Sequence, residues 1–142
     1  MRIDRLLVAC IAAALPLAAA ADDLVVVANP SSGVEKLTRD EVINIFLGRH
    51  RQLPSGIAAM PLDLPASSPD KALFYRKLVG KDLAEINAYW ARLVFSGRTR
   101  PPRQTQNAEE MMSLVNDNRG AVGYVGRPDA GPRAKIVFEL EQ

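Results

Sequence analysis

Cysteine and histidine are almost absent from this sequence, and their scarcity limits the chemistry that the protein can perform. The 142 residues contain one cysteine, Cys10, and one histidine, His50. A lone cysteine cannot form an internal disulfide. His50 lies in a basic loop between Arg49 and Arg51, with no second ligand at metal-binding spacing, so we expect a solvated surface residue. The sequence therefore predicts no metal, no cofactor and no enzymatic activity based on cysteine or histidine.

An excess of either sign of charge is also lacking. The chain carries 18 Lys and Arg against 16 Asp and Glu, for a formal net charge of +2. Domains that bind nucleic acid usually show a clear basic excess. Nucleic acid is therefore not an expected partner.

The sequence has no apolar run long enough for a comfortable membrane span, but its N-terminus has the pattern of a signal peptide. Arg2 and Arg5 precede an apolar stretch at 6–17, and four alanines at 18–21 offer a cleavage site. We predict a cleaved leader at 1–21 and export, most simply to a bacterial periplasm. The alternative is a lipoprotein attached through Cys10, since Leu-Val-Ala-Cys resembles a lipobox. The remaining residues, 22–142, are long enough for one domain.

Apolar patterning in 22–142 predicts strands interleaved with helices. The run at 24–28 is continuous and β-branched, as in a strand covered on both faces, whereas Leu83, Ile86, Trp90 and Leu93 repeat at helical spacing. Residues 96–104 are expected to form a loop without regular structure. Expected strands lie at 24–28, 57–62, 121–126 and 134–140, and expected helices at 38–48, 68–80, 82–94 and 107–116. This order predicts a three-layer α/β/α domain with a mixed, mostly parallel sheet.

The segment 62–80 combines the end of a strand with a helix start. Ser67 or Ser68 is placed to cap the helix, Pro69 suits its first position, Asp70 complements the helix dipole and Gly80 ends it. Helix starts that follow strands hold small anions in many α/β proteins, because free N–H groups point outward there. An ordinary capped helix is the more common interpretation of the same pattern.

Two loops supply further polar side chains. Arg98, Arg100 and Arg103 form either a solvated turn or one wall of an anion site, since arginine suits carboxylate and phosphate groups. Ser31 and Ser32 follow the first strand in a turn.

Four segments resemble one lobe of the periplasmic phosphate-binding proteins that serve ABC transporters, within the type II periplasmic-binding-protein superfamily. These segments are Val25–Pro30, Leu37–Arg49 with its Ile-Phe-Leu-Gly-Arg ending, the loop and helix at 67–74, and Arg119–Val125. The last reads Arg-Gly-Ala-Val-Gly-Tyr-Val, where family members typically show Gly-Ala-Ile-Gly-Tyr-Val. The segments follow the family's order over nearly all of 22–142.

The resemblance implies a non-enzymatic substrate-binding component of an ABC transporter that binds a small, phosphate-like oxyanion. Its partners would be the oxyanion and a transporter permease. The residues expected to bind the anion are the serines at the helix start, assisted by the loop arginines and the first turn: Ser67, Ser68, Arg98, Arg100, Arg103, Ser31 and Ser32.

The sequence departs from the family at the anion loop. Pro69 and Asp70 stand where the family typically has glycine and threonine, and Leu64 lies near the usual arginine. Proline removes an N–H donor, and Asp70 brings a negative charge toward the anion. Such proteins also close two lobes around a ligand, and 22–142 supplies one. The alternative function is an interaction module that pairs with itself or with a membrane sensor or transporter.

Overall fold

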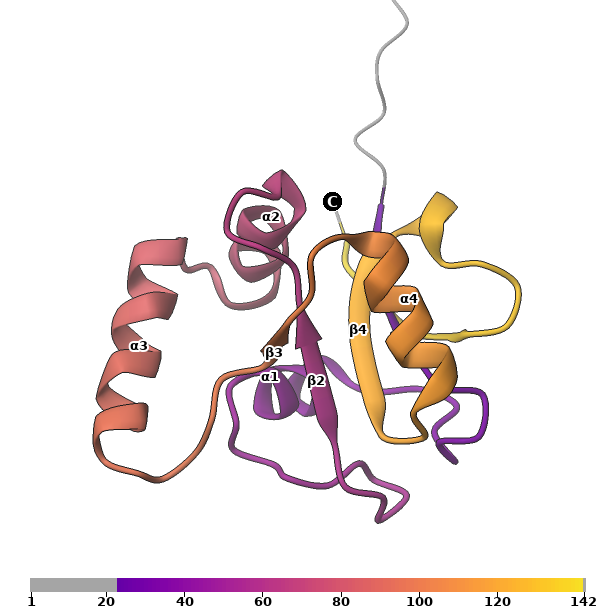
Figure 1. Cartoon of the computed structure of the whole chain (residues 1–142), viewed down its shortest axis with the longest axis horizontal. Coiled ribbons are helices and arrows are strands. Elements are labelled where there is room, and N and C mark those ends of the chain that lie inside the picture. Colours follow the sequence, from indigo (N-terminus) through magenta and orange to yellow (C-terminus); the bar gives the residue numbers. More distant parts are fainter. Residues whose placement is uncertain (1–22, 142) are drawn as a thin grey trace, which may run out of the picture.

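The protein, described by a computed structural model over residues 23–141, arranges its helices around a five-stranded sheet (Figure 1). The predicted leader at 1–21 and Cys10 lie outside the described residues. In chain order the elements are β1 (Leu24–Ala28), α1 (Arg39–Phe46), β2 (Met60–Asp63), α2 (Pro69–Val79), α3 (Leu83–Phe95), β3 (Arg103–Gln104), α4 (Ala108–Asp117), β4 (Ala121–Gly126), the 3-10 turn η1 (Arg127–Asp129) and β5 (Lys135–Glu139). None of the helices within 23–141 is long and apolar enough to cross a membrane.

The sheet has the strand order β3-β2-β4-β1-β5. β2 pairs in parallel with β3 and with β4, whereas β1 pairs antiparallel with β4 and with β5. Four strands therefore run in one direction and β1 alone runs in the other. This arrangement confirms the predicted mixed, mostly parallel sheet.

Helices cover both faces of the sheet, which gives the predicted three layers. At Gly123 of β4, an added Cβ would lie 2.8 Å from the sulfur of Met111, so α4 packs directly on this face. The next residue, Tyr124, points to the other face and stacks on Phe74 of α2 with 3.8 Å between ring centroids. The ring of Phe46, in α1, meets the Phe74 ring edge-on, with 4.9 Å between the ring centroids. α1 and α2 therefore form the opposite layer, and α3 stands beyond α2 at the left of Figure 1.

Local signals account for the helix ends. Thr38 accepts from the backbone N–H of Glu41 at 3.1 Å, and Glu41 accepts from the N–H of Thr38 at 2.9 Å, which completes the predicted capping box. The side chains of Asp82 and Asn107 likewise accept from the backbone N–H groups of Glu85 and Glu110 at the starts of α3 and α4. Gly80 adopts φ 67°, the left-handed conformation that glycine allows at a helix end.

Two predicted segments need correction. The strand expected at 57–62 is found at Met60–Asp63, because Ile57 instead accepts a hydrogen bond from the N–H of Leu53 at 2.8 Å in a turn. The prediction that 96–104 lacks regular structure is wrong at Arg103–Gln104, which form β3. This strand exists because its backbone pairs with Leu62 and Asp63 of β2, and two residues carry no periodic signal of their own.

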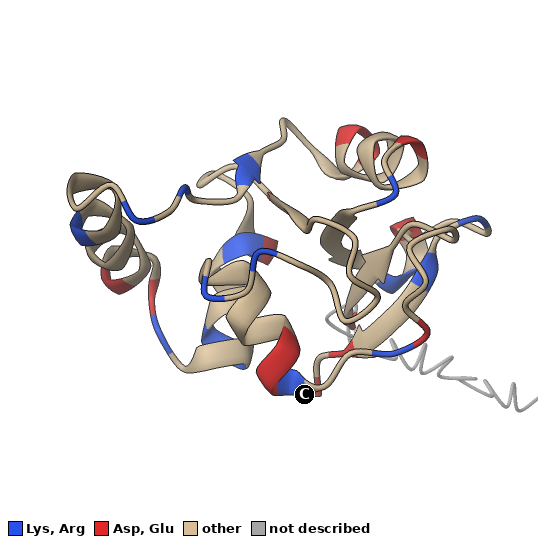
Figure 2. Cartoon of the chain, turned by 90° about the horizontal axis from the view of Figure 1, so that it is seen from below, with Lys and Arg blue, Asp and Glu red and all other residues tan. Residues whose placement is uncertain are grey.

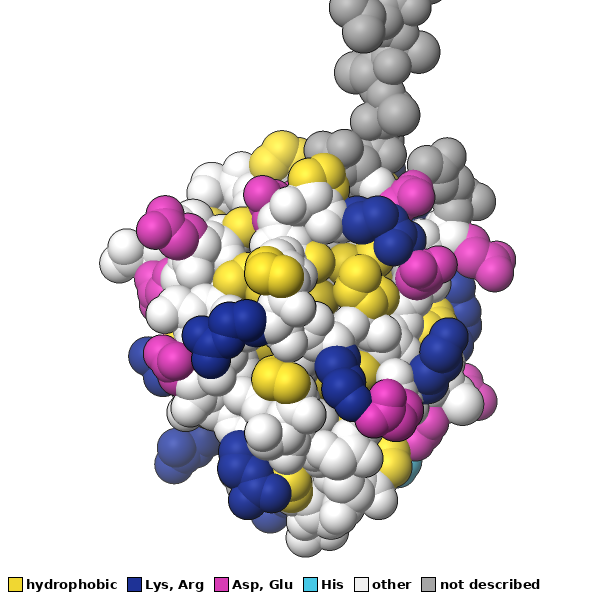
Figure 3. Space-filling model, turned by 90° about the vertical axis from the view of Figure 1, so that its right-hand side faces the viewer, with side chains coloured by type: hydrophobic (Ala, Val, Ile, Leu, Met, Phe, Trp, Pro, Cys, Tyr) yellow, Lys and Arg dark blue, Asp and Glu magenta, His cyan; other side chains and the backbone are white. Residues whose placement is uncertain are grey.

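Charge is distributed unevenly over the surface. The loop that follows α3, seen from below in Figure 2, carries three arginines and no acidic residue between 96 and 104. On the right-hand side of the molecule, basic and acidic side chains alternate (Figure 3). The loop at 96–104 therefore presents positive charge without an acidic residue of its own.

Candidate anion-binding site

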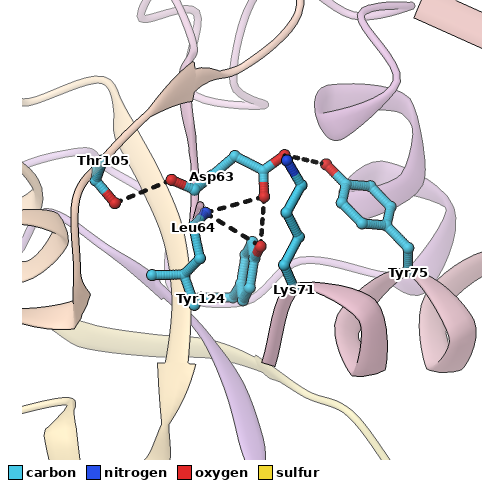
Figure 4. Close-up of polar contacts among 6 residues, drawn as sticks. All are labelled: Asp63, Leu64, Lys71, Tyr75, Thr105 and Tyr124. Carbon is cyan, nitrogen blue, oxygen red and sulfur yellow. Dashed lines mark hydrogen bonds and ion pairs between the residues drawn. The ribbon is translucent and has the colours of Figure 1, made fainter. Parts of the chain in front are cut away.

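A buried cluster of polar side chains lies at the carboxyl end of β2, and it is here called the Asp63 cluster (Figure 4). Asp63 ends β2 and is 5% exposed. Its Oδ1 accepts from the Leu64 N–H at 3.0 Å and from the Tyr124 hydroxyl, and its Oδ2 accepts from the Tyr75 hydroxyl at 2.6 Å. The Lys71 ammonium lies 3.7 Å from Oδ2. The carboxylate is thus surrounded by donors from α2, β4 and its own strand.

The elements around Asp63 explain how this cluster forms. Lys71 and Tyr75 are four residues apart in α2 and project from the same helix face. Tyr124 reaches Asp63 from the neighbouring strand β4, and the Thr105 hydroxyl donates to the Asp63 carbonyl at 2.9 Å from the segment after β3. One residue, through its side chain and its carbonyl, therefore links α2, β2, β4 and the chain leading into α4.

The two tyrosines remain neutral donors in this environment. Burial raises the pKa of Tyr75 well above its ordinary value, and the neighbouring Asp63 carboxylate raises it further. The pKa of Tyr124 is also raised, mainly by burial and next by the Asp63 carboxylate. A protonated hydroxyl is the form that donates a hydrogen bond, so both tyrosines act as donors to the Asp63 side chain. The carboxylate is already occupied by internal partners, which argues against its use as a general base.

Ser67 and Ser68 lie at the start of α2, as expected. Ser68 holds the N-cap position, but its side chain makes no capping hydrogen bond, so the predicted side-chain cap is not formed there. Pro69 is the first helical residue and has no N–H, and the Lys71 N–H donates to the Ser68 carbonyl at 3.1 Å. Few donors are left at this helix start, and the Asp63 cluster adjoins it.

Arg98, Arg100 and Arg103 are brought together at the other end of β2. They line an open pocket of about 740 Å³, here called the arginine pocket, which also includes Met60 and Pro61 at the start of that strand. Two basic residues that the predicted site left out, His50 and Arg51, also line it, and none of the acidic residues within 23–141 does. Four arginines and one histidine therefore surround one concave surface.

Two contacts hold the walls of the arginine pocket in place. The Arg51 guanidinium donates through Nη2 to the Arg98 carbonyl at 2.7 Å, which joins the connection before β2 to the loop after α3. Gly48, at φ 73°, allows close packing, because a Cβ there would lie 2.8 Å from the Thr99 hydroxyl and 2.9 Å from the Trp90 ring. A side chain at this position would push the two walls apart.

Ser31 and Ser32 lie elsewhere and line neither feature. Ser32 is buried, and its hydroxyl accepts from the Val34 N–H at 3.3 Å. The Ser31 N–H donates to the side chain of Asn29 at 2.8 Å, and Asn29 in turn donates to carbonyls at the end of α4. These contacts hold the turn together and attach it to α4. The structure thus places the seven predicted site residues in three separate groups.

Sequence reasoning missed two features of this region. The basic triplet Arg49-His50-Arg51 was a visible signal, and His50 is indeed exposed as expected, yet nothing in the sequence placed the triplet beside Arg98. An acidic residue inside the apolar segment Leu62-Asp63-Leu64 was the available signal for the buried cluster. Within 23–141, no group of three or more His, Cys, Asp or Glu residues is arranged to hold a metal ion.

Comparisons with known proteins support the fold. No protein-family model and no curated protein sequence matches the chain. Among solved structures, an ABC-type phosphate transport receptor from Vibrio cholerae matches with a TM-score of 0.65 and 20% identity, over 82% of this chain and 45% of that one. A putative phosphate ABC transporter substrate-binding protein from Clostridium perfringens, solved with bound phosphate, matches with a TM-score of 0.63 and 14% identity, over 82% of this chain and 44% of that one. PstS from Borrelia burgdorferi matches with a TM-score of 0.63 and 13% identity, over 82% of this chain and 46% of that one.

These matches establish a shared fold over less than half the length of the solved proteins. The chain has the fold of one part of the phosphate ABC transporter binding proteins, consistent with a single lobe. The fold expected from the four sequence segments is therefore confirmed.

Proposed function

We propose that the protein is a non-enzymatic, exported binding protein of the phosphate-binding type, and that the arginine pocket holds its oxyanion. The observation that carries this proposal is the gathering of Arg51, Arg98, Arg100 and Arg103 with His50 around one pocket that no acidic residue of the described part of the chain lines. The solved proteins of the same fold include one that holds phosphate, which makes phosphate the first ligand to test.

Arginine chemistry fits an oxyanion ligand. A guanidinium presents a planar set of N–H donors that match two oxygens at once, and its charge does not depend on pH in the physiological range. The arginines of the pocket are exposed, so each contact alone contributes little. Several arginines that act on one anion supply the affinity together.

The helix start at Ser67 and Ser68 is the alternative place for the anion. Its first helical residue lacks an N–H, and the buried Asp63 carboxylate nearby repels a second negative charge. These two features favour the arginine pocket over the serine pair.

The test is thermal unfolding in phosphate, sulfate, molybdate and chloride at matched ionic strength. A ligand at 100 times its dissociation constant stabilises the fold by about 2.7 kcal/mol, a melting shift on the order of 10 °C at this size. The Arg100→Ala/Arg103→Ala variant should lose most of that shift. Arg133→Ala, which removes an exposed arginine outside the pocket, is the matched control and should keep it.

Ser68→Ala distinguishes the two locations. A phosphate shift that survives in Arg100→Ala/Arg103→Ala and disappears in Ser68→Ala would move the anion to the start of α2. The absence of a shift with every oxyanion would reject the ligand proposal altogether. Cell fractionation tests export, because the proposal requires the protein in the periplasmic fraction.

A second function, an interaction module that pairs with itself or with a membrane sensor or transporter, is favoured by a different observation. Phe95, the last residue of α3, is 96% exposed, and its neighbour Val94 is 53% exposed. Large apolar side chains left in water at one place commonly mark an interaction surface.

A further inference from the structure

Helix α3 carries apolar residues on two faces. Its inner face buries Ile86 and Trp90, and Tyr89 donates its hydroxyl to the Leu47 carbonyl at 2.6 Å. Its outer face exposes Ala84, Ala88, Ala91 and Phe95. Surface helices normally turn a polar face to solvent, so an apolar stripe on the outer face indicates a contact surface.

The four outer residues form one stripe. Their spacing of four, three and four residues puts them on the same side of an α-helix. Three alanines allow another helix to approach closely, whereas Phe95 at the end presents a large apolar surface that is 96% exposed. In Figure 1, α3 lies at the left-hand edge of the fold. All four stripe residues are exposed, and Ala88 and Ala91 border an open pocket between α3 and the α1–α2 layer.

The stripe is symmetric about its midpoint, and this symmetry suits a second copy of the same helix. If two α3 helices pack antiparallel about a two-fold axis between Ala88 and Ala91, Ala88 of one copy faces Ala91 of the other. Phe95 then lies against Ala84, where a small side chain leaves room for the ring. Isologous pairing of this kind uses one surface twice.

The charges beside the stripe complement one another in the same arrangement. Glu85 and Arg92 lie on the same flank of α3, seven residues apart. In the antiparallel pair, Glu85 of one copy lies two residue positions from Arg92 of the other copy. At a rise of about 1.5 Å per residue, this separates them by about 3 Å along the helix axis. Glu85 is already paired with Lys81 at 3.4 Å, yet its side chain is 53% exposed and has room for a second cation. Two such Glu85–Arg92 pairs form in each dimer.

We propose that α3 is a self-association surface through which two copies of this chain pair antiparallel, with Phe95 against Ala84 and Glu85 facing Arg92 of the second copy. The surface borders the arginine pocket through Val94, which lines that pocket. The proposal does not depend on the ligand, because the stripe and its flanking charges lie outside the basic lining of the pocket.

The test measures the dimer dissociation constant by sedimentation velocity over a range of protein concentrations. Phe95→Ser should raise this constant at least about tenfold, because it removes an apolar anchor without touching the core. Its circular dichroism and melting temperature should stay those of the original protein, since the replaced ring is solvent-exposed.

A charge exchange tests the direction of pairing. Glu85→Arg and Arg92→Glu should each weaken the dimer, and the double variant should regain most of the lost affinity because the opposite charges meet again. Glu109→Arg, the same type of change at an exposed position of α4, is the control and should leave the dimer unchanged.

Three results would overturn the proposal. They are a monomer at every concentration, a dimer that Phe95→Ser does not weaken, and a double charge exchange that is weaker than both single variants. Binding of the monomer to phosphatidylglycerol vesicles, lost in Phe95→Ser, would assign the stripe to a membrane surface instead. None of these results bears on the phosphate shift, so each proposal fails separately.

Discussion

The two ends of β2 use charge in opposite ways. At its carboxyl end, the buried Asp63 carboxylate is enclosed by Tyr75, Tyr124 and Lys71. At its other end, the arginine pocket gathers exposed cations around open space. A charge with internal partners supports the fold, whereas exposed charges of one sign are available to a ligand. The comparison separates the residues that hold this protein together from those that we propose to bind.

The largest effect should follow from Asp63→Ala. This change leaves two tyrosine hydroxyls, a backbone N–H and Lys71 without their common partner, so the free energy of unfolding should fall by about 3–5 kcal/mol. Urea unfolding measures the loss, and Asp117→Ala, on the exposed end of α4, should cost little. A loss in Asp63→Ala as small as in the control would show that the cluster does not stabilise the fold.

A smaller effect should appear at alkaline pH. An unfolded tyrosine ionises near pH 10, whereas burial and Asp63 raise the pKa of both cluster tyrosines in the folded protein. The folded state therefore favours the protonated hydroxyls, so their contribution is present below about pH 10 and is lost above it. Each tyrosine should lower the free energy of unfolding by about 1.4 kcal/mol per pH unit above that point.

Urea unfolding between about pH 9 and pH 11 checks this slope. The Tyr75→Phe/Tyr124→Phe variant should be less stable at neutral pH, since two hydrogen bonds to a carboxylate are gone. It should also lose stability more slowly as the pH rises. Equal slopes in the variant and the original protein would mean that these tyrosines ionise normally in the folded state.

The smallest effect on stability is expected at the arginine pocket. Without ligand, Arg100→Ala/Arg103→Ala should change the free energy of unfolding by less than about 0.5 kcal/mol, because both side chains are exposed. The same urea experiment measures it. A large loss would show that these arginines support the fold and would weaken the contrast between the two ends of β2.

Much of the fold could be predicted because its signals are local. The capping box at Thr38, the end of α2 at Gly80 and the continuous apolar run of β1 each depend on residues within one or two turns. The segments that resemble phosphate-binding proteins placed these elements in the correct architecture. The two-residue strand β3 escaped prediction because its backbone is ordered by pairing with β2 alone.

The candidate site was harder to predict, since its residues are distant in sequence. Arg98, Arg100 and Arg103 were recognised as a basic loop, but the side chain that joins them, Arg51, lies 47 positions before Arg98. The serines at 67–68 were grouped with them as a helix start that resembles an anion loop, and those at 31–32 as a neighbouring turn, but neither pair lines the arginine pocket.

By itself, the sequence determined most of the segments that become helices and strands, where the helices begin and end, and which faces are apolar, because propensity, capping and periodicity act between near neighbours. Only the tertiary structure decided that Asp63 meets Tyr124, 61 positions further on, and that two basic loops share one pocket. Contacts of that range depend on the order of strands in the sheet and on which helix covers which face. The packing of the whole core sets both.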